Sequence, residues 1–109
     1  MRILYCGIPD DYSKLSSEIR HRFDYDGEYI SSTDLEISLN SIRRIVKRND
    51  VLLVDLEFMS NTVAMALALA AEYNLEIVGF YAGEEPPATR YTDVCEAIYD
   101  IDDVIDHFI

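Results

Sequence analysis

The stretch Val51-Leu52-Leu53-Val54-Asp55 decides the fold that we expect for this chain. Four consecutive aliphatic side chains are typical of a strand buried on both faces, and such strands belong to parallel sheets covered by helices. The aspartate that ends the run places a carboxylate where the strand ends. We therefore expect residues 51–54 to form the central strand of an α/β domain.

The sequence before this strand predicts two more strands and two helices. Apolar residues 3–8 predict the first strand, and residues 28–32 predict the second. Between them, apolar side chains at helical spacing predict a helix that ends near Arg22. Thr33 and Glu36 have the spacing of a capping box, so we expect the next helix to begin at Thr33.

The sequence after the central strand predicts a nearly all-apolar helix from Ser60 or Asn61 to about Tyr73. Such a helix is buried on more than one side, so we expect one side to face the sheet and the other a partner subunit. Asn74 is a candidate left-handed C-cap. Residues 76–81 predict the fourth strand.

The end of the chain is open to two interpretations. Residues 93–99 predict a fifth strand, although residues 92–99 also fit a helix. Only about 11 residues separate the fourth and fifth strands, so the helix between them is expected to be short or absent. Asp100 is a candidate cap for a final helix.

This pattern predicts a single α/β domain over residues 1–109, with a flavodoxin-like, doubly wound, five-stranded parallel sheet in the order 2-1-3-4-5. In such a sheet the strand order reverses between the first and third strands. Ligands bind at that point, outside the carboxyl ends of the strands. Segments 7–12 and 55–62 border the expected site.

The charge of the chain narrows the classes of partner. Its 109 residues include 21 acids and 9 bases, which gives a formal net charge of −12. Such a chain lacks the surplus bases that bind nucleic acids or anionic membranes. The apolar N-terminal stretch is too short for a signal peptide and residues 58–71 are too short to span a membrane, so we expect a cytoplasmic protein.

Several residues have ordinary structural interpretations beside functional ones. Cys6 and Cys95 are expected to be buried, reduced thiols, with a redox or nucleophilic role as the alternative. His21 and His107 are expected on exposed helix surfaces. The basic cluster at residues 43–48 is interpreted as a solvated helix end, or as a contact for an acidic surface such as a second subunit.

Asp55 is the strongest candidate site residue, as an acceptor for sugar hydroxyls, a metal ligand or a phosphoacceptor. Its alternative role is to cap a neighbouring loop or helix. With Asp10 and Asp11, it is a candidate for binding a divalent cation, whereas the simpler interpretation of those two residues is a solvated loop with an N-cap.

Four other residues are candidates for ligand contact. Asn61 and Thr62 open a helix whose amides either hold a phosphate or carboxylate or form an ordinary cap. Tyr5 and Tyr12 lie near enough to the expected site to stack on a base. The four glycines form neither a GxGxxG motif nor a phosphate-binding loop.

Three segments together resemble the nucleoside 2-deoxyribosyltransferase superfamily: Asn49-Asp50-Val51-Leu52-Leu53-Val54-Asp55, then Asn61-Thr62-Val63-Ala64-Met65-Ala66-Leu67-Ala68, then Tyr73-Asn74-Leu75-Glu76-Ile77-Val78. The resemblance implies the same five-stranded fold. It also implies that Asp55 is the strand-end acid that orients sugar and base, and that Tyr5 or Gly7 forms the pocket floor.

The chain departs from that family at the catalytic position. The nucleophilic glutamate of the family falls at Met65 or Ala66, and neither side chain is able to form a covalent glycosyl intermediate. Glu57 is a substitute only if its loop folds inward. The chain also resembles response-regulator receivers in its acids at 10, 11 and 55, but it lacks their lysine after the fifth strand.

We therefore expect a nucleoside- or nucleotide-binding domain without transferase activity, in a sensing, sequestering or regulatory role. The acids near the expected site favour an uncharged nucleoside or a metal-assisted ligand. One alternative is an active N-glycoside hydrolase or deoxyribosyltransferase that uses Asp55 or Glu57. Another is a protein-interaction module without a small-molecule ligand. A homo-oligomer through the helix at 61–73 is also expected.

Overall fold

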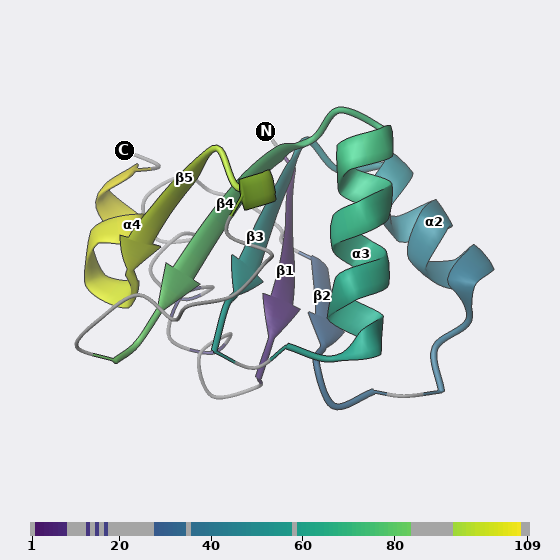
Figure 1. Cartoon of the computed structure of the whole chain (residues 1–109), viewed down its shortest axis with the longest axis horizontal. Helices are drawn as coiled ribbons and strands as arrows, with labels where there is room; N and C mark the ends of the chain where they lie inside the picture. The colour runs from purple at the N-terminus through teal and green to yellow at the C-terminus, as the bar shows by residue number, and fades with distance from the viewer. Residues whose placement is uncertain are drawn as a thin grey trace.

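The sheet of the computed structural model contains five parallel strands in the order β2-β1-β3-β4-β5, as predicted. The structure describes residues 2–8, 13, 15, 17, 28–34, 36–57, 59–83 and 93–107. The strands are β1 (Ile3–Gly7), β2 (Glu28–Ser31), β3 (Val51–Asp55), β4 (Glu76–Tyr81) and β5 (Ala97–Asp100). Their arrowheads all point to the lower edge of Figure 1, which is the carboxyl edge of the sheet.

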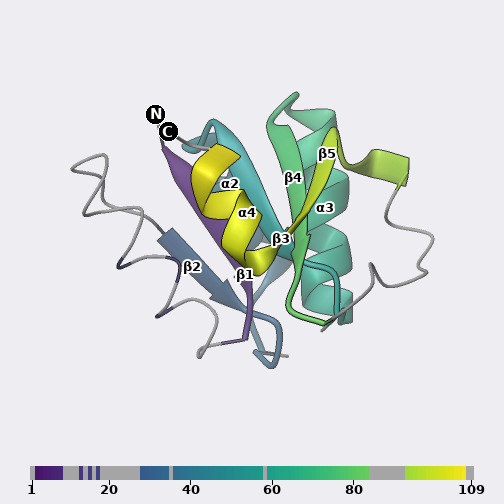
Figure 2. The same cartoon turned by 90° about the vertical axis from the view of Figure 1, so that its left-hand side faces the viewer.

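Helices cover both faces of this sheet. The helices are α2 (Leu39–Lys47), α3 (Asn61–Glu72) and α4 (Ile101–His107). Figures 1 and 2 show α4 on the side of the sheet opposite α2 and α3. Ser13, Leu15 and Ser17 are also helical, whereas the rest of the predicted helix ending near Arg22 lies outside the described residues.

Alternation along the strands divides the core into two layers. Leu4, Leu52 and Val54 face α2 and α3. Leu53 and Phe80 face the opposite layer, which contains apolar side chains of α4. Because β3 is buried on both faces, its uninterrupted aliphatic run is explained by the layers on either side of it.

The prediction that a helix begins at Thr33 is wrong. Thr33 lies in a turn after β2, where its backbone amide donates to the Ser31 hydroxyl oxygen. The observed N-cap is Ser38, whose hydroxyl oxygen accepts a hydrogen bond from the Ser41 amide. Ser38 and Ser41 therefore supply the cap that the spacing of Thr33 and Glu36 had suggested.

The other helix signals are confirmed. Ser60 caps α3, since its hydroxyl oxygen accepts from the Val63 amide. Asn74 adopts a φ of 60°, the left-handed conformation expected after a helix end. Asp100 caps α4, because its Oδ1 accepts from the amides of Asp102 and Asp103.

The last part of the chain before α4 forms a strand, β5, and a short helical turn precedes this strand. Residues 93–94 form a single helical turn, and the fifth strand begins at Ala97 rather than at residue 93. Residues 84–92, where a helix between β4 and β5 would lie, are outside the described residues. No described helix is long and apolar enough to cross a membrane.

The all-apolar sequence of α3 has an explanation within the chain. One side of α3 packs on the sheet and a second side packs against α2. Val63, Ala66 and Ala70 are therefore fully buried without a partner subunit. Ala64 and Met65 are partly exposed and Ala68 is exposed, so a limited apolar surface remains on α3.

A charged network holds the amino edge of the sheet. Arg48 donates two hydrogen bonds to the Glu28 carboxylate, one of them from Nε at 2.7 Å, and the Asn49 amide nitrogen donates to Glu28 Oε1 at 3.2 Å. The pKa of the Glu28 carboxyl lies below its ordinary value of 4.5, chiefly because of the hydrogen bonds from Arg48. Burial acts in the opposite direction, whereas Asn49 and the charges of Arg48 and Arg2 add to the lowering.

We expect Glu28→Gln to destabilise the protein at neutral pH, because a carboxylate with a lowered pKa favours the folded state above its unfolded pKa. The contribution disappears as the pH falls through the folded-state pKa. Urea midpoints of the wild type and variant should therefore converge between neutral pH and about pH 3. A difference that stays constant over this range would contradict the role of the Glu28 charge.

Candidate functional site

The strand order reverses between β1 and β3, and Gly7 and Asp55 end these two strands at the carboxyl edge. A Cβ atom built on Gly7 would lie 2.8 Å from Asp55 Cβ and 2.5 Å from the Tyr5 hydroxyl oxygen. Glycine is therefore required there for the carboxylate-bearing side chain and the phenol to approach the strand end. The structure brings together Tyr5, Gly7 and Asp55, three of the residues predicted from the sequence.

The Asp55 side chain is completely buried. Its Oδ1 accepts a hydrogen bond from the Glu57 amide at 3.0 Å, which closes the turn after β3. This contact fits the predicted alternative role, in which Asp55 stabilises its own loop.

Tyr5 serves mainly as a core residue. Its side chain is 3% exposed, and its ring lies 5.4 Å from the Tyr29 ring and 5.7 Å from the Phe80 ring, centroid to centroid. A ring packed in this way has no open face for a base, so stacking would require Tyr5 to leave the core. Its hydroxyl, which donates to the Ile8 carbonyl at 3.0 Å, is the part that reaches the strand edge.

Tyr29 also belongs to this edge, and sequence reasoning missed it. Its hydroxyl donates to the Gly7 carbonyl at 3.3 Å, beside the Ser32 amide, which donates to the same oxygen. The sequence could have indicated it, because Tyr29 lies on the predicted second strand, and the predicted sheet order places that strand next to the first. Tyr29 therefore helps to fix the backbone of Gly7.

Glu57 holds the neighbouring loop. Its Oε1 accepts hydrogen bonds from the Ala82 and Gly83 amides, at 3.1 and 2.7 Å. These two amides follow β4, so the carboxylate connects the turns after β3 and β4. These two hydrogen bonds hold the Glu57 carboxylate in the loop.

The start of α3 contributes one exposed and one buried candidate. Asn61 is exposed, whereas Thr62 is 2% exposed. The Thr62 hydroxyl donates to the Asp34 carbonyl at 2.6 Å. The Thr62 side chain therefore joins α3 to the turn after β2. Of the two residues predicted to contact a ligand at the start of α3, only Asn61 is exposed.

Three predicted site residues, Asp10, Asp11 and Tyr12, lie outside the described residues, as does His21. The proposed cation site of Asp10, Asp11 and Asp55 is therefore not described. Within the described ranges, no three His, Cys, Asp or Glu side chains gather closely enough to hold a metal ion.

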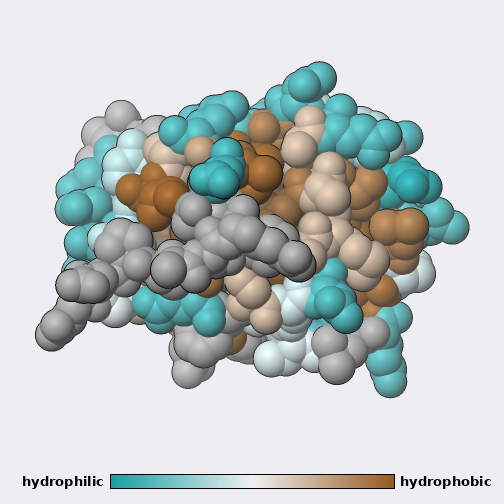
Figure 3. All heavy atoms as spheres, in the orientation of Figure 1, coloured by the Kyte–Doolittle hydropathy of each residue, from teal (hydrophilic) through white to brown (hydrophobic). Residues whose placement is uncertain are grey.

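Met65 and Ala66, which the sequence resemblance aligned with a nucleophile, both lie on α3. Ala66 is fully buried in the layer between α3 and the sheet. Met65 lies on the outer surface of α3, where it lines an open depression with Asn61, Ala64 and Ala68, among others. Figure 3 shows apolar residues gathered on the face of the molecule that carries α3.

Both cysteines are free thiols with raised pKa values. Burial raises the pKa of the Cys6 thiol to about 12 and that of the half-buried Cys95 thiol to about 11. Because the thiolate is the reactive form, neither group is activated for nucleophilic chemistry.

We expect iodoacetamide at about pH 8 to leave Cys6 unmodified in the folded protein and to modify Cys95 slowly. Intact-mass measurement should show both thiols alkylated after unfolding in urea. Rapid stoichiometric modification of Cys6 in the folded protein would show that it is accessible and ionised, contrary to its burial.

No protein-family model matches the chain, and no curated protein matches it. Solved structures do match. One is the N-terminal domain of a response regulator/sensory box/GGDEF 3-domain protein from Carboxydothermus hydrogenoformans, with 19% identity and a TM-score of 0.67 over 99% of this chain and 90% of that chain.

Two further structures share the architecture. A flavodoxin-like domain from Synechococcus sp has 14% identity and a TM-score of 0.54, over 78% of this chain and 66% of that chain. A 3-dehydroquinate dehydratase-like protein from Bifidobacterium longum has 10% identity and a TM-score of 0.57, over 100% and 98% of the two chains. At these identities the similarity establishes the fold alone: the chain has a flavodoxin-like α/β fold.

Proposed function

We propose that this domain binds a nucleoside or nucleotide at the carboxyl edge between β1 and β3, and does not transfer its sugar. The observation that carries the proposal is the convergence of Asp55 and the Tyr5 hydroxyl over Gly7. It occurs where the strand order reverses, which is where ligands bind in sheets of this kind. The resemblance to the deoxyribosyltransferases supplies the ligand class.

In this proposal Asp55 accepts a hydrogen bond from a sugar hydroxyl. An ionised carboxylate only accepts hydrogen bonds, so it pairs with a hydroxyl group that donates. Because Asp55 is completely buried, the edge must open before a ligand reaches it. Association is therefore expected to be slower than a diffusion-controlled encounter.

The charges at the edge favour an uncharged ligand. Asp55 and Glu57 place two carboxyl groups on the turn after β3. A phosphate would be repelled by them, although the positive end of the α3 dipole partly offsets this repulsion. We therefore expect a nucleoside to bind more tightly than the corresponding monophosphate.

Several features support binding rather than catalysis. Met65 and Ala66 have no carboxylate at the position of the family's nucleophile. Glu57 is held by two loop amides, and Asp55 closes its own turn. These features suit a sensing, sequestering or regulatory domain.

Two other functions remain as alternatives. In the first, Asp55 or Glu57 catalyses cleavage of an N-glycosidic bond. In the second, the domain binds only other proteins, and the partly exposed apolar surface of α3 is where such a partner would bind. We do not propose phosphoryl transfer to Asp55, because no lysine follows Lys47 in the chain.

The test is calorimetric titration with nucleosides, nucleoside monophosphates and cyclic nucleotides, combined with chromatography for released base. We expect binding without release. Asp55→Asn should weaken binding at least tenfold, equivalent to about 1.4 kcal/mol. Glu57→Gln is the matched control, since it also removes one negative charge but retains an oxygen for the Ala82 and Gly83 amides.

Each other result favours a different function. Release of free base that is lost in Asp55→Asn or Glu57→Gln would support the enzyme. No heat and no change in melting temperature with any ligand would reject nucleoside binding and leave the interaction module.

A further inference from the structure

The outward face of α2 carries a stripe of polar and basic side chains. Asn40, Arg43, Arg44 and Lys47 follow the spacing i, i+3, i+4 and i+7, which places them on one side of a helix. They line a shallow depression together. Ile42 and Val46 are completely buried on the opposite side of α2. We call these four outward residues the α2 stripe.

The positive charges of the α2 stripe are not paired with acids in the part of the chain that the structure describes. Arg43 and Arg44 donate 3.4 Å hydrogen bonds to the neutral side chains of Asn40 and Ser41. Lys47 Nζ lies 5.1 Å from the centre of the Tyr73 ring. The described ion pairs are at Glu28, on the amino edge.

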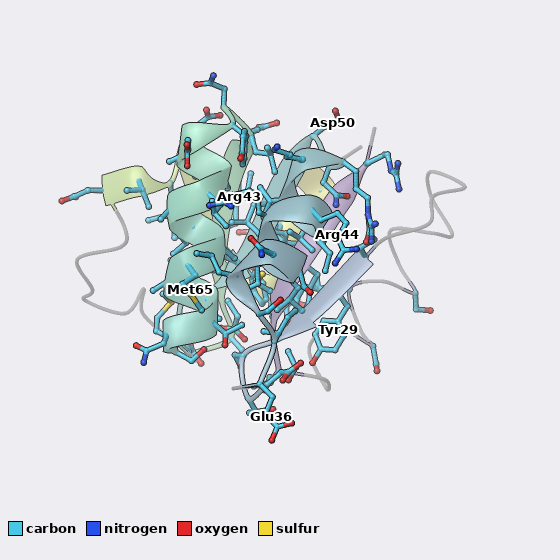
Figure 4. All side chains as sticks on the ribbon, turned by 90° about the vertical axis from the view of Figure 1, so that its right-hand side faces the viewer. Tyr29, Glu36, Arg43, Arg44, Asp50 and Met65 are labelled. Carbon is cyan, nitrogen blue, oxygen red and sulfur yellow. The ribbon has the colours of Figure 1, made fainter. Side chains whose placement is uncertain are left out.

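Exposed acids lie just before the first turn of the same helix. Asp34 and Glu36 are both exposed, and Asp34 Oδ1 accepts from the Glu36 amide, which fixes the turn between them. Figure 4 shows Arg43 and Arg44 along α2 and Glu36 beyond its N-terminal end. The surface therefore changes from acidic to basic along the direction of α2.

A second copy of this surface, rotated by 180°, would place its acidic end opposite the basic end of the first copy. If two copies place their α2 helices antiparallel, the basic end of each helix faces Asp34 and Glu36 of the other. A two-fold axis requires this reciprocal arrangement. Leu39, 45% exposed, lies at the first residue of α2, between the acids and the arginines, and offers an apolar contact near the axis.

We propose that a second copy of this chain docks on the α2 stripe, through antiparallel packing of α2 against α2. The whole-chain charge of −12 makes most contacts between two copies repulsive. Three of the nine bases lie on the α2 stripe, so this face offers the local positive charge that an acidic copy requires. The proposal does not depend on nucleoside binding.

Sedimentation velocity at micromolar protein concentration tests the proposal. The wild type should be dimeric at low salt, with a dissociation constant that rises at least tenfold between about 0.05 and 0.5 M NaCl, because exposed charges are screened. Arg44→Glu should give a monomer. Arg44→Glu combined with Glu36→Arg should restore the dimer, since the exchanged charges attract again.

Asp102→Lys is the control, because Asp102 is an exposed acid on α4, on the opposite face of the sheet. It should leave the dimer intact. Circular dichroism should show that every variant is folded. A monomeric wild type, a dimer that survives Arg44→Glu, or a dimer lost in Asp102→Lys would each overturn the proposal, the last by indicating head-to-tail contact with α4.

Discussion

Replacing Phe80 by alanine is expected to lower the free energy of unfolding by about 3–5 kcal/mol. Phe80 is completely buried on β4 and is the largest of the fully buried side chains described. Its ring packs against Tyr5, so the substitution leaves a cavity beside the residue that reaches the strand edge. Urea unfolding at 25 °C measures this loss, provided that the dependence of the unfolding free energy on urea concentration is the same in the two proteins.

Tyr81→Ala is the matched control for this prediction. Tyr81 is the next residue on β4 and is also aromatic, but it is only half-buried. Its truncation should cost much less, because less surface returns to water and no enclosed cavity forms. A loss at Phe80 no larger than that at Tyr81 would show that the opposite layer of the core is not packed as described.

The second large effect is expected from Gly7→Ala, which should destabilise the fold by about 1–3 kcal/mol and also weaken nucleoside binding. The added methyl group would meet Asp55 Cβ at 2.8 Å and the Tyr5 hydroxyl oxygen at 2.5 Å. Real side chains do not approach so closely, so Asp55 or Tyr5 must move. Urea unfolding and calorimetric titration measure the two consequences separately.

Gly79→Ala separates the effect on the site from the effect on stability. A methyl group at Gly79 would meet Leu56 Cδ1 at 2.7 Å and Cys95 Sγ at 3.1 Å. These atoms are at the ends of side chains, so some destabilisation is expected. Nucleoside binding should be unchanged, because Gly79 lies within β4 rather than at the edge. Equal losses of affinity in the two variants would refute a specific role for Gly7.

The sequence predicted those features that depend on local pattern and on chain topology. The aliphatic run of β3 can be buried on both sides only in a covered sheet, and the alternation of elements then limits the strand order. Asn74 and Asp100 were recognisable because their cap chemistry involves neighbours within a few residues. The proximity of Gly7 and Asp55 followed from the strand order.

Features that depend on distant contacts were not predictable in this way. A local pattern also failed where neighbouring serines compete: Thr33 and Glu36 have the spacing of a capping box, but Ser31 engages Thr33 in a turn and Ser38 caps α2. The amides that Glu57 binds lie 25 and 26 residues away. Sequence reasoning also did not foresee that α2 packs against α3, while a partner subunit on the remaining surface of α3 stays a prediction.

The most direct test of the proposed site is the change in backbone amide NMR signals when a 2′-deoxynucleoside is added to the wild-type protein. We predict saturable shifts concentrated at Gly7, Asp55 and Glu57, with the signals of the α2 stripe unchanged. Absence of any shift at millimolar nucleoside, or shifts confined to residues away from the carboxyl edge of β1 and β3, would contradict the account.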